Sequence, residues 1–138
     1  MDTIFSKYNE KVKFIKSLNE KKSRQEHNAF YIEGIKVVDE ILNKKEAIDI
    51  MFIAYSNQLL LNANGGKELL EKFENDYKNI ERVDIDANIF KSLTDTKTPQ
   101  GVLAVINKQD KDILSLNFES DVLILDKIQD SRKYWNNN

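Results

Sequence analysis

Ala29-Phe30-Tyr31-Ile32-Glu33-Gly34-Ile35-Lys36-Val37-Val38 sets the architecture of this chain, because its pattern changes from strand to helix at one glycine. The first five residues are rich in aromatic and β-branched side chains and predict a strand. Gly34 then opens a helix that is predicted to continue to about Asn43, with its apolar residues facing inward. A strand that leads directly into an amphipathic helix is typical of an α/β protein.

The segment before this strand predicts an amphipathic helix over about 7–20, with Ser6 as its N-cap. With about 100° between successive residues, the apolar side chains share one arc of this helix and polar side chains share the opposite arc. The apolar arc holds Tyr8, Val12, Ile15 and Leu18. The arc that stays free to meet a ligand holds Asn9, Lys13 and Lys16. The polar segment 21–26 is predicted to continue as a short helix.

Strands and helices continue to alternate after Asn43. Apolar segments predict further strands at 48–54, 81–85 and 101–106. Ser56 is predicted to cap a helix that is interrupted near Gly65-Gly66, and a short helix is predicted from Ala87 to Leu93. This order predicts an α/β sandwich with a mostly parallel or mixed sheet. Residues 108–120 are predicted to form a charged linker, after which 122–125 begins a new strand.

The composition is that of a single domain of ordinary size, with room for a fragment of another. The 138 residues are 41% hydrophobic and 32% charged, and no apolar run approaches the roughly 20 residues that span a bilayer. The first residues contain no apolar signal core, so we expect a cytoplasmic protein without membrane attachment. Because cysteine is absent, disulfides, thiolate zinc sites and thiol nucleophiles are excluded.

The net charge of −2 conceals a strong asymmetry along the chain. Residues 1–24 carry about +4 and the remainder about −6. A basic arm on an acidic body predicts a polyanionic partner at one end of the protein. The alternative is a solvated lysine-rich helix without a ligand, which charge alone does not exclude.

No catalytic constellation emerges from the residues. His27 is the only histidine and lies in a polar stretch without an acidic partner nearby in sequence, so a surface role is expected. Gly65-Gly66 is not followed by the lysine and hydroxyl residue of a phosphate-binding loop, and predicts a helix break instead. The pairs Asp84/Asp86 and Asp126/Asp130 are expected at solvated strand ends and not around a cation. The residues therefore predict a binding domain and no metal or catalytic site.

Three stretches resemble the SpoU/TrmH family of RNA methyltransferases. Asn9-x-x-Val12-Lys13-x-Ile15-x-Ser17-Leu18-x-x-Lys21-Lys22-x-Arg24, followed by Phe30-x-x-Glu33-Gly34-x-Lys36-x-Val38-x-Glu40, resembles the opening of these enzymes. Ser92-Leu93-Thr94-Asp95-Thr96-Lys97-Thr98-Pro99-Gln100-Gly101-Val102-Leu103-Ala104-Val105 resembles the end of their substrate-binding domain. Leu125-Asp126-Lys127-Ile128-Gln129-Asp130 resembles the first strand of their catalytic domain. The three stretches occur in the family's order.

The resemblance implies a three-layer α/β/α sandwich with a mixed sheet over residues 1–107, similar to ribosomal proteins that bind kink-turn RNA. This domain would bind a ribosomal or transfer RNA substrate and present a ribose to a knotted domain. In the family that second domain binds S-adenosylmethionine and methylates the 2′-hydroxyl, usually in a homodimer. Residues 108–120 would be the linker and 121–130 the first catalytic strand. The catalytic and cofactor-binding residues of the family are absent, so we expect an inactive chain without a cofactor.

The RNA-binding residues that this resemblance and the physical properties of the side chains suggest lie in two groups. The first contributes cations that neutralise phosphates and an amide that bonds a base edge or a 2′-hydroxyl, and Arg24 could in addition stack or bind bidentately. It consists of Asn9, Lys13, Lys16, Lys21, Lys22 and Arg24. The second, Glu33 and Gly34, occupies the strand-to-helix turn, where glycine permits close approach to a ligand. A capping or structural contact is the alternative for Glu33, and turn chemistry is the expected role of 96–101.

The last eight residues, 131–138, depart from the family. Gln-Asp is typically followed there by Pro-Gly-Asn-x-Gly-x-x-x-Arg, whereas Ser131 occupies the proline position here and the rest of the motif is missing. A single base inserted into a plausible coding of that motif yields Ser-Arg-Lys-Tyr-Trp-Asn-Asn-Asn and a stop, which is the observed tail. We therefore expect a frameshift after Asp130. The alternative is an autonomous RNA-binding protein of the ribosomal kink-turn type with a native tail.

Overall fold

The computed structural model describes residues 2–108, in which helices cover both faces of a four-stranded sheet. The remaining part of the predicted linker 108–120, the predicted strand 121–130 and the predicted tail 131–138 lie outside the described residues. No helix within 2–108 combines the length and apolar character needed to cross a membrane.

The elements alternate in the way that the sequence predicts. In chain order they are α1 (Glu10–Ser17), α2 (Lys21–His27), β1 (Ala29–Glu33), α3 (Ile35–Asn43), β2 (Ile50–Tyr55), α4 (Asn57–Asn62), α5 (Gly66–Asn75), β3 (Arg82–Asp84), α6 (Ala87–Leu93) and β4 (Val102–Asn107). All four predicted strands are confirmed, with shifts of a few residues at their ends. The predicted helix break at Gly65-Gly66 is confirmed, because α4 ends before it and α5 begins at the second glycine.

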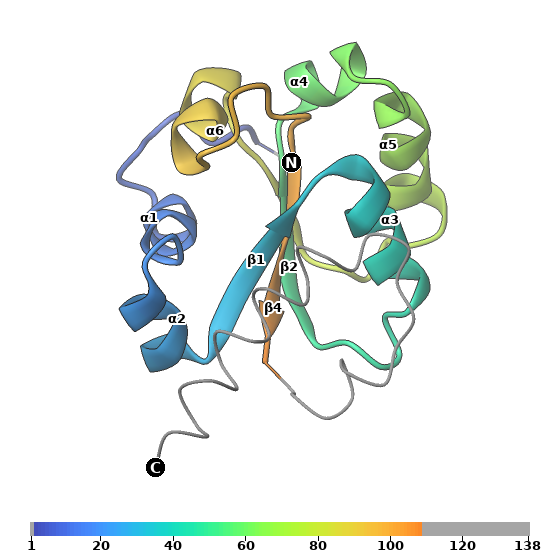
Figure 1. Cartoon of the computed structure of the whole chain (residues 1–138). Helices are drawn as coiled ribbons and strands as arrows, with labels where there is room; N and C mark the ends of the chain where they lie inside the picture. The colour runs from blue at the N-terminus through green and yellow to red at the C-terminus, as the bar shows by residue number, and fades with distance from the viewer. Residues whose placement is uncertain (1, 109–138) are drawn as a thin grey trace.

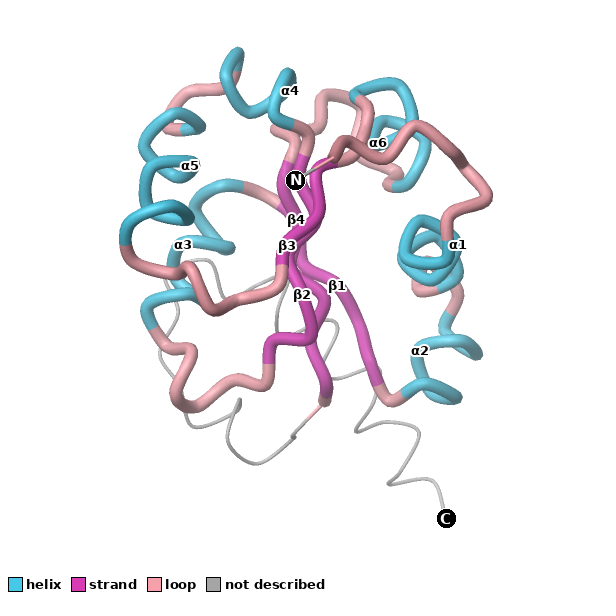
Figure 2. Tube along the Cα trace, turned by 180° about the vertical axis from the view of Figure 1, so that it is seen from behind, coloured by secondary structure: helices cyan, strands magenta, loops and turns pink. Residues whose placement is uncertain are grey.

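The sheet is mixed, in the order β1-β4-β2-β3. Strand β4 pairs antiparallel with β1 and with β2, while β3 pairs parallel with β2. Val105 lies opposite Tyr31 on one side and opposite Phe52 on the other, which fixes the register of the three antiparallel strands. In Figure 2 the sheet is seen nearly edge-on, with α1, α2 and α6 on one face and α3, α4 and α5 on the other. The predicted three-layer α/β/α sandwich is therefore confirmed.

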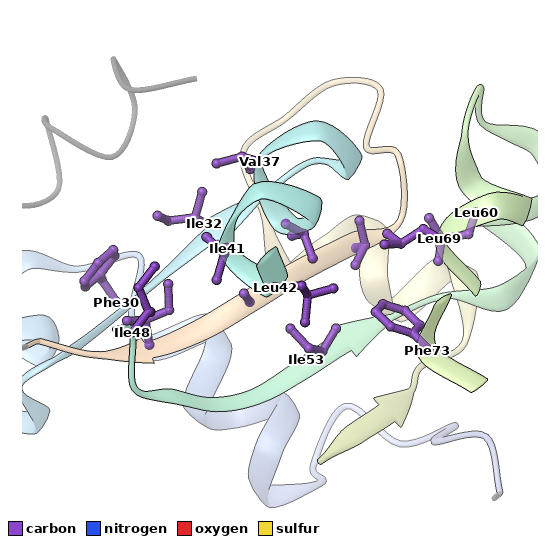
Figure 3. Packing of buried hydrophobic residues seen from close by; sticks show 14 residues of the cluster. Phe30, Ile32, Val37, Ile41, Leu42, Ile48, Ile53, Leu60, Leu69 and Phe73 are labelled. Atoms are coloured by element: carbon purple, nitrogen blue, oxygen red, sulfur yellow. The ribbon is translucent and has the colours of Figure 1, made fainter. Parts of the chain in front are cut away.

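Each face of the sheet has its own hydrophobic core. Alternate residues of the central strand β4 point to opposite faces, so Ala104 joins one core and Val105 the other. Figure 3 shows the core beneath α3, α4 and α5, where Phe73 and Ile53 are fully buried. The second core lies beneath α1 and α6 and contains Phe90. Because both faces are covered, the central strands are almost continuously apolar, as the sequence predicts for 48–54 and 101–106.

The start of the first helix differs from the prediction. Helix α1 begins at Glu10, and its N-cap is Asn9 and not Ser6. The Oδ1 atom of Asn9 accepts hydrogen bonds from the backbone N–H groups of Lys11 and Val12, which satisfies two donors of the first turn. Tyr8 therefore lies before the helix, and its side chain is 73% exposed where the helical pattern placed it in the core.

The segment before Ser6 extends the sheet beyond β3. Ile4 forms a parallel bridge with Ile85, and its N–H donates to the carbonyl of Asp84 at 2.8 Å. The N–H of Asp86 in turn donates to the carbonyl of Ile4 at 2.9 Å, and Thr3 Oγ1 donates to the Asp84 carboxylate at 2.7 Å. The N–H and carbonyl of Ile4 and the hydroxyl of Thr3 therefore fix this segment to the sheet.

Gly101 connects the loop after α6 to β4 with a backbone φ of +100°, a conformation that side chains disfavour. A Cβ atom at this position would lie 2.6 Å from Cβ of Leu59, because the loop passes directly over the start of α4. The carbonyl of Gly101 also accepts a hydrogen bond from the N–H of Ser56 at 2.8 Å. This glycine therefore allows the close approach of its loop to the start of α4 at one end of the sheet.

We predict that Gly101→Ala lowers the free energy of unfolding by about 2 to 5 kcal/mol, from backbone strain and from overpacking against Leu59. Gly34→Ala is the matched control, since Gly34 has a φ of +119° but its added Cβ would meet no atom closer than 3.5 Å. It should lose only the strain contribution, about 1 to 3 kcal/mol. Urea unfolding monitored by circular dichroism measures both values. Equal losses in the two variants would contradict the role of the close approach.

Candidate nucleic-acid interface

Exposed lysines of α1 and α2 form a basic surface on one face of the molecule. Lys13 and Lys16 lie on the outer side of α1, as the helical pattern predicts, while the opposite side of this helix is buried against the sheet. Lys21 and Lys22 begin α2 and are also exposed. Figure 1 shows the two helices side by side in the same layer. The arrangement places four cations on one layer of the sandwich.

Arg24 differs from these lysines because it is buried, with 7% of its surface exposed. Its Nη1 atom donates to the backbone carbonyl of Leu18 at 3.0 Å, which joins α2 to the end of α1. The hydrogen bond supplies an acceptor for a buried cation and satisfies a carbonyl at a helix end. Arg24 therefore has a structural contact that the sequence did not predict.

Tyr31 occupies the middle of β1, on the face of the sheet that α1 and α6 cover, and links three elements. Its hydroxyl donates to Oδ1 of Asn19, and the Asn19 amide nitrogen donates to the carbonyl of Leu93 at 2.7 Å. This chain of hydrogen bonds runs from β1 through the turn between α1 and α2 to the end of α6. Burial raises the pKa of Tyr31, the carboxylates of Glu33 and Asp95 raise it further, and Arg24 lowers it.

The β1–α3 turn and the loop after α6 are held together by two side chains. Thr96 Oγ1 donates to Oε1 of Glu33 at 2.6 Å. Gln100 Oε1 accepts from the N–H of Ile35 at 2.7 Å and so caps the first turn of α3. Gly34 has a φ of +119°, a conformation close to the region that only glycine occupies readily. The turn chemistry expected for 96–101 is thus seen at Thr96, Gln100 and Gly101.

The predicted residues lie in the two regions that the sequence indicates, which are the helices α1 and α2 and the β1–α3 turn. The charge of Arg24 lowers the pKa of Tyr31 and that of Glu33 raises it, so one charged residue of each region lies within electrostatic range of this tyrosine. Lys13 and Lys16 instead lie on the outer surface of α1, and Asn9 lies at its start. Hydrogen bonds to the backbone of α1 use Oδ1 of Asn9, which leaves its amide nitrogen as the group that could donate to a ligand.

Sequence reasoning missed Asn19, Tyr31 and Gln100, which position the two groups. No local pattern distinguishes a strand tyrosine with a buried hydroxyl partner from any other core aromatic residue. One feature of the sequence could have indicated Tyr31, namely a hydroxyl in a predicted buried strand, because buried hydroxyls require hydrogen-bond partners.

Comparison with known proteins identifies relatives of this chain. The sequence profile of the MRM3-like substrate binding domain matches residues 9–104. The 23S rRNA (guanosine(2553)-2′-O)-methyltransferase RlmP of Bacillus subtilis (strain 168) is 27% identical over 130 residues, which cover 94% of this chain and 46% of RlmP. This chain therefore spans less than half the length of that relative.

Solved structures show the same fold. The rRNA methyltransferase of Sinorhizobium meliloti superimposes with a TM-score of 0.57 at 22% identity, over 78% of this chain and 37% of that chain. The SpoU methyltransferase AviRb of Streptomyces viridochromogenes, solved in complex with AdoMet, gives a TM-score of 0.54 at 17% identity, over 82% of this chain and 40% of its own. At these identities the likeness establishes the fold.

We predict that the free energy of unfolding falls as the pH rises above about 10, the ordinary pKa of tyrosine. The raised pKa keeps Tyr31 neutral in the folded state, while the unfolded chain ionises, so stability is complete below pH 10 and is then lost by at most about 1.4 kcal/mol per pH unit. Tyr31→Phe should flatten this decline, which urea unfolding at several pH values measures.

Tyr8→Phe is the control, because it removes an exposed hydroxyl and should leave the decline unchanged. Burial and the nearby Asp84 also raise the pKa of Tyr55, so a smaller decline should remain in Tyr31→Phe. If the free energy of unfolding fell equally with pH in wild type and Tyr31→Phe, the buried hydroxyl of Tyr31 would not be a cause of the decline.

Proposed function

The chain belongs to the family of MRM3-like substrate-binding domains, the N-terminal domains of SpoU/TrmH RNA methyltransferases, and from this premise we propose that residues 1–107 bind the RNA substrate of a 2′-O-ribose methyltransferase. The observation that carries the proposal is the basic surface of α1 and α2. Its four exposed lysines lie within the part of the chain that the family profile matches. Cations in this number on one face favour a polyanionic ligand, because each phosphate contact releases counterions.

Each predicted residue then has a specific role. Lys13, Lys16, Lys21 and Lys22 contact phosphates. Asn9 donates its amide N–H to a base edge or a 2′-hydroxyl while its oxygen caps α1. Arg24 acts as a positioning residue, since its buried guanidinium holds the basic helix α2 against the end of α1.

Glu33 and Gly34 form a second contact region in this proposal. The turn is fixed by Thr96 and Gln100, so its backbone has little freedom left to lose when a ligand binds. Because glycine has no side chain, a ribose or phosphate can approach the backbone of Gly34 closely.

Chemistry would come from a different part of the methyltransferase. RlmP is a methyltransferase of 23S rRNA, and AviRb was solved with AdoMet, so we propose ribosomal RNA as the substrate and S-adenosylmethionine as the methyl donor of the complete enzyme. Residues 108–120 would connect to that domain and 121–130 would begin it. Such a protein would act in the cytoplasm, where ribosomal RNA is modified.

We expect the double variant Lys21→Glu/Lys22→Glu to weaken RNA binding by about tenfold or more at low salt. The slope of log K against log salt should become less steep by about 0.7 for each phosphate of a single-stranded RNA that the variant no longer neutralises. Fluorescence anisotropy with a labelled ribosomal RNA fragment at several salt concentrations measures both effects.

Lys67→Glu/Lys78→Glu is the matched control for this experiment. Both lysines are exposed, but they belong to α5 and the segment after it, on the opposite layer of the sandwich. The control changes the net charge equally, so it separates a specific surface from a general charge effect. Equal losses in the two double variants would argue against the basic surface of α1 and α2 as the RNA site.

A second expectation concerns activity. Because the matched family is a substrate-binding domain, the purified chain should not transfer a methyl group from radiolabelled S-adenosylmethionine to RNA that it binds. A full-length relative such as RlmP serves as the positive control. Incorporation of label into RNA by this chain alone would contradict the proposal that RNA binding and methyl transfer belong to different parts of the enzyme.

A further inference from the structure

A cleft of about 230 Å³ opens at the ends of β2 and β3, beside the N-terminal segment. Its lining includes Phe5, the first two residues of α4, Asn57 and Gln58, and Asp86 before α6. Sites for drug-sized ligands occupy about 300 to 1,000 Å³, so this cleft has room for a smaller group.

Phe5 is an aromatic residue that lies outside the hydrophobic core. The ring is 75% exposed, although hydrogen bonds hold the backbone of the preceding residue, Ile4, to β3 and to Asp86. Tyr8, three residues later, is 73% exposed. Within residues 2–108 these are the only exposed large aromatic side chains.

Basic groups accompany these two rings. The ammonium group of Lys7 lies 5.3 Å from the centre of the Tyr8 ring, and Lys13 follows on the outer side of α1. Proteins recognise unpaired RNA by stacking bases on aromatic side chains while nearby cations bind the backbone. The N-terminal segment has both properties next to a cleft of base size.

The carboxylate of Asp86 is one of the polar groups that line the cleft. Its Oδ2 atom accepts from the N–H groups of Asn88 and Ile89 and so caps α6. Within residues 2–108, Oδ1 of Asp86 has no donor. The neighbouring carboxylate of Asp84 differs, because it accepts from Thr3 and from the N–H of Asn57. An ionised carboxylate only accepts hydrogen bonds, so Asp86 selects a ligand that donates one.

We propose that this cleft binds one unpaired RNA base that carries an exocyclic amino group. The base stacks on Phe5, and its amino group donates to Oδ1 of Asp86. Cytosine, adenine and guanine have such a group, whereas uracil has a carbonyl oxygen at the corresponding exocyclic position. The ring N3–H of uracil, its donor on this edge, lies between two carbonyl oxygens that a carboxylate repels. The inference rests on the proposed RNA binding and adds to it a subsite and a preference among bases.

The test compares labelled oligocytidine and oligouridine of equal length by fluorescence anisotropy. These RNAs have the same charge and differ at the exocyclic group, so the wild-type chain should bind oligocytidine at least about fivefold more tightly. Asp86→Asn should abolish or invert this preference, because the amide can donate to the uracil carbonyl. Asparagine is as good an N-cap as aspartate, so α6 should be retained.

Phe5→Ala should weaken the binding of oligocytidine by at least about fivefold through the loss of stacking. Met51→Ala is its control, since Met51 is also an exposed apolar residue but lies near the start of β2, at the other end of the sheet. Thermal unfolding should give the same midpoint for wild type, Phe5→Ala and Asp86→Asn.

The possible outcomes separate the subsite from RNA binding as a whole. Equal affinity of the wild type for the two RNAs, or unchanged binding by Phe5→Ala or Asp86→Asn, would overturn the subsite while salt-dependent binding upholds the proposed function. Absence of salt-dependent binding to ribosomal RNA as well as to both oligonucleotides would overturn the proposed function together with the subsite.

Discussion

The structure depends on the burial of β4, which is paired on both edges and covered on both faces. A strand in this position must satisfy its backbone by hydrogen bonds to two neighbours and its side chains by two hydrophobic layers. Helices on both faces of the sheet supply these layers. Because β4 runs antiparallel to β1 and β2, and β3 runs parallel to β2, the carboxyl ends of β1, β2 and β3 meet the start of β4 at one end of the sheet. That end gathers Gly34, Ser56, Asp86 and Gly101, although they are far apart in sequence.

Most of this architecture could be predicted from local patterns, since long apolar runs and periodic helices depend little on tertiary context. Ser56 was predicted as an N-cap and does accept a hydrogen bond from Leu59. The start of α1 could not be predicted as well, because Ser6 and Asn9 are both good caps and only the geometry of the chain decides between them. Because Asn9 is the cap, Tyr8 lies before the helix and is exposed.

The candidate interface was less accessible to sequence reasoning. Helical periodicity correctly predicted that Lys13 and Lys16 are exposed, because their helix packs its opposite side on the sheet. It could not predict that Arg24 is buried, since this depends on how α2 lies against β1 after the turn at Asn19. Contact of any of these residues with RNA stays a prediction, because neither a helical pattern nor a hydrogen-bond network identifies the ligand.

The charge asymmetry along the sequence corresponds to a difference in charge between the two helical layers of the fold. Residues 1–24 supply the cations of one layer, whereas α5 on the other layer carries an excess of acidic residues. A polyanion is therefore attracted to the α1 and α2 face before any specific contact forms. The cleft at the end of the sheet is lined by the carboxylates of Asp84 and Asp86, so the nucleotide of the proposed subsite would enter it with an uncharged part. In the proposed subsite a base would enter this cleft while its phosphate stays outside, and this division of contacts would fix the orientation of the bound nucleotide.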